Sequence, residues 1–156
     1  MMSKTRIVSA LGLILFVASA NLYAATACSN RSVAGRWALT SNGTLLTTGG
    51  LIPVAAVSDF SINASGAISG RQTRSLGGQV ADETFSGRIS AKADCSAEST
   101  VQVFLDGALV RTTTLHIVFD DNSSSARGIF TSLTLPNNTA LPNVITFDAR
   151  KLFPKD

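Results

Sequence analysis

The chain has 156 residues, of which 45% are hydrophobic and 15% are charged, and its formal net charge is +3 at pH 7. So large an apolar share with so small a net charge excludes a disordered chain. Its lysines and arginines are scattered singly rather than gathered in a basic stripe, which argues against a nucleic-acid-binding protein.

The first 24 residues have the pattern of a cleaved export signal. Lys4 and Arg6 form a short positive start, residues 7–20 are apolar and uncharged, and small residues surround Ala24. The apolar stretch is shorter than the ~18 residues that a membrane-spanning helix needs, so an uncleaved anchor is the lesser alternative. We expect cleavage after Ala24, with other positions in 20–27 as alternatives.

The remaining chain, residues 25–156, has the length of one domain. Removal of the signal takes Lys4 and Arg6 away, so that 11 basic residues face 10 acidic ones and the net charge falls to +1. A chain of about 130 residues buries enough apolar surface to fold alone. We therefore expect a single exported, soluble domain that is periplasmic or extracellular, with no membrane span in its mature form. Its oligomeric state is left open.

The mature chain contains two cysteines, Cys28 and Cys95. In an exported protein an isolated pair is most simply a disulfide. A metal site or a reactive thiol lacks support, because neither cysteine has a neighbouring histidine or a CxxC partner. A lipid-modified Cys28 is a minor alternative, since Ala25 stands where such signals have Leu.

Short runs rich in Val, Ile, Thr and Phe follow the export segment and alternate with Gly, Asn, Asp and Ser clusters, as strands and turns do. The predicted strands, the second with a break near Ser58, are 35–40, 51–63, 67–75, 84–93, 99–106, 108–120, 126–135 and 144–152. Residues 63–66 and the Asp106-Gly107 pair predict tight hairpins. Residues 137–142 form the longest predicted loop, interpreted as a solvated connector.

Hairpins between eight or nine short strands indicate an antiparallel meander. A meander avoids exposed edges most completely when it closes into a barrel. A β-sandwich is the competing architecture, but it uses longer crossovers than this chain offers. The predicted fold class is therefore all-β, an antiparallel meander of about eight strands closed into a small barrel. Such a barrel is either filled by side chains or just able to hold one small ligand.

Three short motifs resemble small barrels of known families. Gly35-Arg-Trp37 resembles the Gly-x-Trp start of lipocalins and the similar start of avidins, and the hairpin at 60–70 is similar to the second hairpin of an avidin-type meander. Thr84-Phe-Ser-Gly87 with the later Asp94-Cys95 pair resembles secreted bacterial proteins of uncharacterised function that have a calycin-like or allene-oxide-cyclase-like barrel. The resemblance covers most of the mature chain and implies a calycin-like barrel.

The chain departs from these families at two points. Lipocalins usually close with an Arg that stacks on the Trp, and Arg150 is the candidate here, but strand alternation turns Arg150 outward if Phe147 is buried. The dense ligand set of avidins is missing, because Trp37 is the only Trp and Tyr23, the only Tyr, lies in the export signal. Biotin binding is therefore not implied.

The sequence predicts no catalytic residue, no metal site and no cofactor. His116, the only histidine, lies in a strand, and no Gly-x-Ser-x-Gly element accompanies it. Asp120-Asp-Asn122 lacks the spacing of a calcium loop and is interpreted as a solvated turn. Asp82 and Glu83 face opposite sides of a strand, so they are interpreted as surface charges rather than an acid–base pair.

The barrel interior is the remaining candidate site. Alternation and side-chain type place these residues inside: Trp37, Leu39, Phe60, Ile62, Ile68, Phe85, Ile89, Val103, Leu115, Ile117 and Phe119. The predicted ligand-binding residues among them are Trp37, Phe60, Phe85, Leu115, Ile117 and Phe119. The same residues also describe an ordinary packed core, which is the simpler interpretation.

Three functions are compatible with these observations. The leading hypothesis is an exported, non-catalytic barrel that binds a small hydrophobic ligand or a protein partner. The second is an isomerase of the allene-oxide-cyclase kind, which would need at least one buried polar cluster. The third is a structural, envelope-associated protein that makes contacts through Ser/Thr-rich strand faces. The sequence identifies neither the ligand nor the partner.

Overall fold

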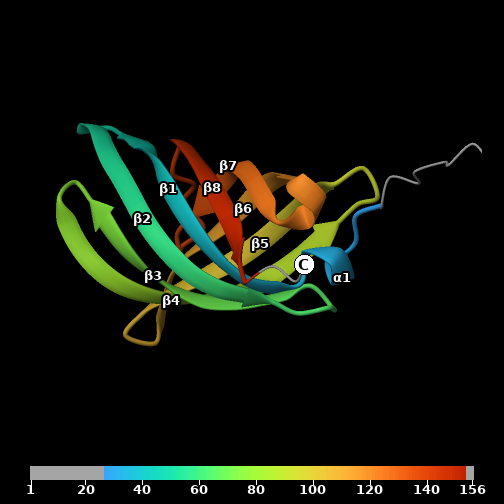
Figure 1. The fold of residues 1–156 in the computed structure, drawn as a ribbon. Helices are drawn as coiled ribbons and strands as arrows, with labels where there is room; N and C mark the ends of the chain where they lie inside the picture. Colours follow the sequence, from blue (N-terminus) through green and yellow to red (C-terminus); the bar gives the residue numbers. More distant parts are fainter. Residues whose placement is uncertain (1–26, 154–156) are drawn as a thin grey trace, which may run out of the picture.

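The computed structural model describes residues 27–153 as an antiparallel barrel of eight strands (Figure 1). A short helix, α1 (Asn30–Val33), comes first. The strands are β1 (Gly35–Thr47), β2 (Gly50–Ile62), β3 (Ala67–Leu76), β4 (Gln79–Ala91), β5 (Ser96–Leu105), β6 (Ala108–Asp120), β7 (Ser125–Thr134) and β8 (Asn143–Leu152), with a 3₁₀ turn (Asp121–Ser123) before β7. Each strand pairs with the next, and β8 pairs with β1. The predicted fold class is confirmed, whereas the predicted export signal lies outside the described residues.

The largest errors in the strand predictions concern three strands, β1, β2 and β4. β1 continues to Thr47 because its inward positions Ser41 and Gly43, although not apolar, pair with both β2 and β8. β2 runs unbroken through Ser58, whose hydroxyl faces inward and donates a hydrogen bond to Gln72 Oε1 at 3.3 Å. β4 begins at Gln79 rather than at residue 84. All three segments have polar or small residues at inward positions, so they lack the apolar alternation by which strands were predicted.

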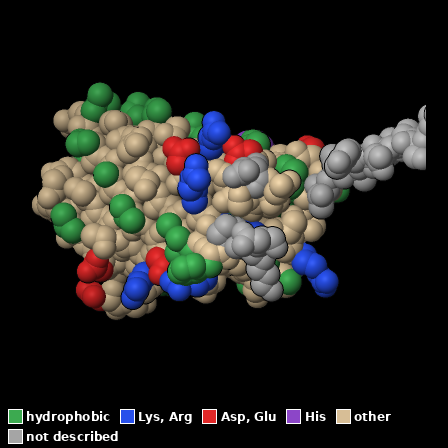
Figure 2. Space-filling model, in the orientation of Figure 1, with side chains coloured by type: hydrophobic (Ala, Val, Ile, Leu, Met, Phe, Trp, Pro, Cys, Tyr) green, Lys and Arg blue, Asp and Glu red, His purple; other side chains and the backbone are tan. Residues whose placement is uncertain are grey.

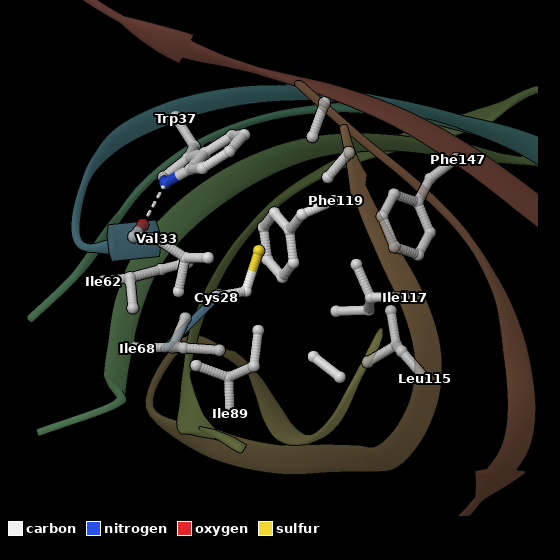
Figure 3. Packing of buried hydrophobic residues seen from close by; sticks show 13 residues of the cluster. Cys28, Val33, Trp37, Ile62, Ile68, Ile89, Leu115, Ile117, Phe119 and Phe147 are labelled. Atoms are coloured by element: carbon white, nitrogen blue, oxygen red, sulfur yellow. Dashed lines mark hydrogen bonds between the residues drawn. The ribbon is translucent and has the colours of Figure 1, made fainter. Parts of the chain in front are cut away.

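The helix α1 closes one end of the barrel. The Ser29 hydroxyl caps it by accepting a hydrogen bond from the Ser32 N–H at 3.2 Å. Val33 has no exposed surface, and its carbonyl accepts the Trp37 Nε1–H at 2.9 Å, the dashed line in Figure 3. Trp37 also packs edge-on against Phe119, with 5.6 Å between the ring centroids. Together these contacts anchor the helix over the barrel interior.

A disulfide between Cys28 and Cys95 ties the segment before α1 to the turn between β4 and β5. The two cysteines are 67 positions apart, so the bond removes loop-closure entropy from the unfolded chain. The bond also occupies the Cys28 sulfur that a lipid modification would need. The predicted disulfide is confirmed.

Removal of this disulfide is expected to lower the free energy of unfolding by about 2–5 kcal/mol. Urea denaturation of the wild type and of a C28A/C95A variant, each with and without a phosphine reductant, measures the effect. The double variant should match the reduced wild type and should not respond to the reductant. Equal stability of the oxidised and reduced wild type would contradict the prediction.

The outer surface carries charges of both signs. Arg36 pairs with Asp59 at 2.7 Å and Arg127 pairs with Asp120 at 2.9 Å; both arginines are exposed and both carboxylates are partly exposed. Figure 2 shows Lys and Arg side chains beside Asp and Glu on one face of the molecule. Such exposed pairs contribute at most about 1 kcal/mol each, so they do not determine the fold. Within residues 27–153, no helix is long and apolar enough to cross a membrane.

Candidate functional site: the barrel cavity

The barrel interior contains a cavity of about 290 Å³. All the predicted ligand-binding residues line it: Trp37, Phe60, Phe85, Leu115, Ile117 and Phe119. The other predicted interior residues, Leu39, Ile62, Ile68, Ile89 and Val103, line it as well. Strand alternation therefore identified the inward face correctly, and the interior holds a cavity in addition to packed side chains. Its volume is close to the ~300 Å³ at the lower end of small-molecule pockets.

An aromatic pair forms part of the cavity wall towards α1. Phe60 and Phe85 lie opposite Gly70 on its two sides, and their ring centroids are 5.9 Å apart. A Cβ atom at Gly70 would overlap the Phe60 side chain and would lie 2.6 Å from the Asp59 carbonyl oxygen. The missing side chain at Gly70 thus lets two aromatic rings from strands on either side of β3 meet over it.

A smaller apolar cluster lines the end of the cavity opposite α1. Leu45, Leu133 and Ile145 form its buried centre, and Leu141 packs against them. Leu141 comes from the loop after β7, where its N–H donates to the Leu133 carbonyl at 2.8 Å. Residues 137–142 of this loop are predicted to be a solvated connector, and that prediction is wrong for Leu141, which lines the cavity together with Leu135 at the end of the predicted strand 126–135.

A buried polar cluster also lines the cavity, centred on Glu83 of β4. Glu83 is only 3% exposed, and its carboxylate accepts four hydrogen bonds. Arg111 donates from Nη1 to Oε1 at 2.9 Å and from Nη2 to Oε2 at 2.6 Å. Arg74 Nε donates to Oε1 at 2.9 Å, and Gln72 Nε2 donates to Oε2 at 2.7 Å. We call Gln72, Arg74, Glu83 and Arg111 the interior charge cluster.

The interpretation of Glu83 as a surface charge was wrong. Side chains alternate between the two faces of a strand, so Glu83 must share the inward face with Phe85, two positions away. The interpretation was correct for Asp82, which is exposed and accepts a hydrogen bond from the Thr73 hydroxyl at 2.6 Å. Arg111 lies four positions before the inward Leu115, so the same alternation places Arg111 on the inward face. Counting positions from the predicted interior residues was therefore sufficient to find the cluster.

Arg111 reaches the cluster beside a β-bulge. In the pairing of β5 with β6, Val103 lies opposite Arg111 and Phe104 lies opposite Leu109, which leaves Val110 without a partner position. A bulge of this kind redirects neighbouring side chains. Val110 and Arg111 both line the cavity as a result.

Glu83 is ionised at neutral pH. Burial alone would raise its pKa, but the hydrogen bonds and the positive charge of Arg111, with the hydrogen bonds of Gln72 and Arg74, lower the pKa from 4.5 to about 2. The carboxylate oxygens are fully engaged with these donors. Glu83 is therefore a weak proton acceptor whose main effect is to hold two arginines inside the barrel.

The other residues considered in the sequence lie elsewhere. His116 is exposed on the outer face of β6, and Asp120 pairs with Arg127. Arg150 faces outward, as alternation predicted, and the next residue, Lys151, lies over the Trp37 ring with Nζ 5.4 Å from its centroid. In the part of the chain that the structure describes, no three His, Cys, Asp or Glu side chains are grouped to hold a metal ion.

Comparisons with known proteins add little to this geometry. No protein-family model and no curated protein matches the chain. Among solved structures, it is similar to a redesigned β-barrel, mFAP1, bound to DFHBI, with 12% identity and a TM-score of 0.48. The match covers 78% of this chain and 99% of that one. The class of the protein, an eight-stranded antiparallel barrel with a cavity and a buried charge cluster, therefore rests on its own strand pairing.

Proposed function

We propose that this protein is an exported, non-catalytic, calycin-like barrel that binds a small hydrophobic ligand in its cavity. The observation that carries the proposal is the cavity itself, about 290 Å³ in volume and lined mainly by apolar side chains. The residues proposed to contact the ligand are Trp37, Phe60, Phe85, Leu115, Ile117 and Phe119. These side chains come from four strands, so closure of the barrel is what assembles the site.

Export is part of this proposed function. Residues 1–24 are proposed to be a cleaved signal, and residues 25–156 are proposed to be the mature single domain. The Cys28–Cys95 disulfide supports export, because such bonds persist in oxidising compartments such as the periplasm or the extracellular medium.

The interior charge cluster favours one second candidate, an isomerase of the allene-oxide-cyclase kind. It supplies the buried polar group that such an enzyme would need. However, Glu83 accepts four hydrogen bonds and has a pKa of about 2, which suits it poorly to proton transfer near neutral pH. Arg74 and Arg111 donate hydrogen bonds but do not accept a proton. Binding is therefore the better supported function.

A matched pair of substitutions on β2 tests the proposed binding site. Ala56 faces the cavity, whereas its neighbour Ala55 is exposed on the outer face. The probe is N-phenyl-1-naphthylamine, a neutral dye that fluoresces in apolar surroundings. Because a Phe at position 56 fills the cavity, A56F is expected to lower the affinity for the dye by about tenfold or more, equivalent to at least about 1.4 kcal/mol. A55F should leave the affinity for the dye unchanged.

Circular dichroism of both variants checks that each keeps its strand content. If A56F folds and binds the dye as tightly as the wild type does, the dye lies outside the cavity and the proposed site is wrong. A wild type that binds no dye would count against the proposed function as a whole.

A further inference from the structure

We propose that the ligand of the cavity is an amphiphile with an apolar body and a carboxylate head, and that Arg74 binds this head. This inference rests on the proposed function and specifies the chemical class of its ligand. It depends on three observations: the charge balance of the interior, the hydrogen bonds of Arg74, and the position of the interior charge cluster along the barrel axis.

The charges that line the cavity do not balance. Among the described residues, those that line the cavity and carry charge are Arg74, Glu83 and Arg111, so two cations face one carboxylate. Arginine stays protonated at any pH at which proteins fold. A charge removed from water needs a partner of opposite sign. An anionic group in the cavity would bring the net charge of the interior from +1 to zero.

Arg74 is the cation with unused hydrogen-bonding capacity. Arg111 donates two parallel hydrogen bonds to Glu83, whereas Arg74 donates one, from Nε at 2.9 Å. Arg74 Nη1 is buried and has no hydrogen-bond partner within residues 27–153. Glu83 does not serve as that partner, because each of its oxygens already accepts two hydrogen bonds. A carboxylate suits the planar guanidinium better than a neutral head does, since the hydrogen bond is charge-assisted.

Strand pairing places this head site away from α1. Arg74 lies opposite Ala81, close to the hairpin at 77–78, whereas Phe60, Gly70 and Phe85 are aligned nearer to the α1 end. Arg111 follows the hairpin at 106–107, which lies at the same end of the barrel as the hairpin at 77–78 because successive strands alternate in direction. A ligand with its head at Arg74 would therefore extend its body past the Phe60–Phe85 pair.

Displacement of N-phenyl-1-naphthylamine by decanoate and by decan-1-ol tests the inference, because the two competitors share a body and differ in the head. On the wild type, decanoate is expected to compete about tenfold better than decan-1-ol. The variant R74M should remove this preference by weakening decanoate about tenfold while changing decan-1-ol less than about twofold. Glu83 keeps Arg111 and Gln72 in this variant, so the cluster stays neutralised.

The matched control is R71M, which removes an exposed arginine from the outer face of the same strand. It should preserve the preference for decanoate. If R74M does not fold, R74K provides the test, because it keeps the charge but loses the planar fork and should reduce the preference without abolishing it.

The outcomes separate this inference from the proposed function. If decanoate and decan-1-ol compete equally on the wild type, the ligand has no need of a carboxylate and this inference is wrong. The same conclusion follows if R71M and R74M weaken decanoate binding equally. In both cases the proposed binding of a hydrophobic ligand in the cavity is unaffected. If neither the dye nor decan-1-ol binds, the proposed function fails, and this inference fails with it.

Discussion

Replacement of Glu83 by alanine is expected to lower the free energy of unfolding by about 3–5 kcal/mol. The substitution leaves Arg74 and Arg111, which are largely buried, without their shared carboxylate, and it removes the acceptor of the Gln72 amide. Two largely buried charges without a partner lower the free energy of unfolding far more than the loss of one hydrogen bond does. Urea denaturation at pH 7 followed by circular dichroism measures the change.

Two further variants test the cause of this loss. D82A removes the exposed carboxylate next to Glu83, whose partner is the Thr73 hydroxyl, and is expected to cost less than about 1 kcal/mol. The triple variant R74M/E83L/R111M removes all three charges together and should be much more stable than E83A, because apolar replacement of a whole buried ion cluster is often neutral. Equal destabilisation by D82A and E83A would contradict the role given to Glu83.

The pH dependence of stability provides a second check on Glu83. Its pKa in the folded protein is about 2, below the ordinary value of 4.5, so its ionised form stabilises the fold above pH 4.5 and this stability is lost as the pH falls towards 2. The shift corresponds to about 3 kcal/mol. The difference in unfolding free energy between wild type and E83Q should therefore narrow between pH 5 and pH 2. A difference that stays constant over this range would disagree with the depressed pKa.

Replacement of Trp37 by alanine is expected to cost about 3–5 kcal/mol of unfolding free energy. Trp37 is 1% exposed, and it contacts both Phe119 and the carbonyl of Val33. Its loss would leave a void between α1 and the barrel. Figure 3 shows how Trp37, Val33 and Phe119 meet at this end of the interior. Urea denaturation monitored by circular dichroism measures the change, since the variant lacks the only tryptophan.

A graded series identifies what Trp37 contributes. W37F keeps an aromatic ring but leaves the Val33 carbonyl without its donor. Its free energy of unfolding should therefore lie between those of the wild type and W37A. V57A on the outer face of β2, where Val57 is 62% exposed, should change stability by less than about 0.5 kcal/mol. A W37A protein as stable as V57A would show that α1 does not depend on Trp37.

The barrel could be predicted from the sequence because its signals are local. Turn residues at 63–66 and at Asp106-Gly107 predicted two hairpins correctly. Alternation around Leu115 and Phe85 predicted correctly which side chains face the interior. The polar part of the interior was missed because interior residues were chosen by hydrophobicity. Glu83 was assigned to the surface although its distance from Phe85 in the sequence places it inside.

Other features of the site depend on long-range pairing and were not predictable from local pattern. Ser58 is a polar residue at an inward position of β2. Its hydroxyl has a hydrogen-bond acceptor there because Gln72 of the neighbouring strand β3 lies beside it. The cavity likewise depends on how far barrel closure separates the inward side chains, and on positions such as Gly70, where a side chain is missing. Neither property is visible in a single segment of sequence.

Native mass spectrometry of the mature protein, purified from the cells that naturally produce it, tests the proposed ligand-binding function most directly. We expect a chain that begins near Ala25, retains the Cys28–Cys95 bond and carries one small molecule that is released on unfolding. A chain that is found without any bound molecule, and that takes up none from an apolar extract of the same cells, would contradict a ligand-binding barrel.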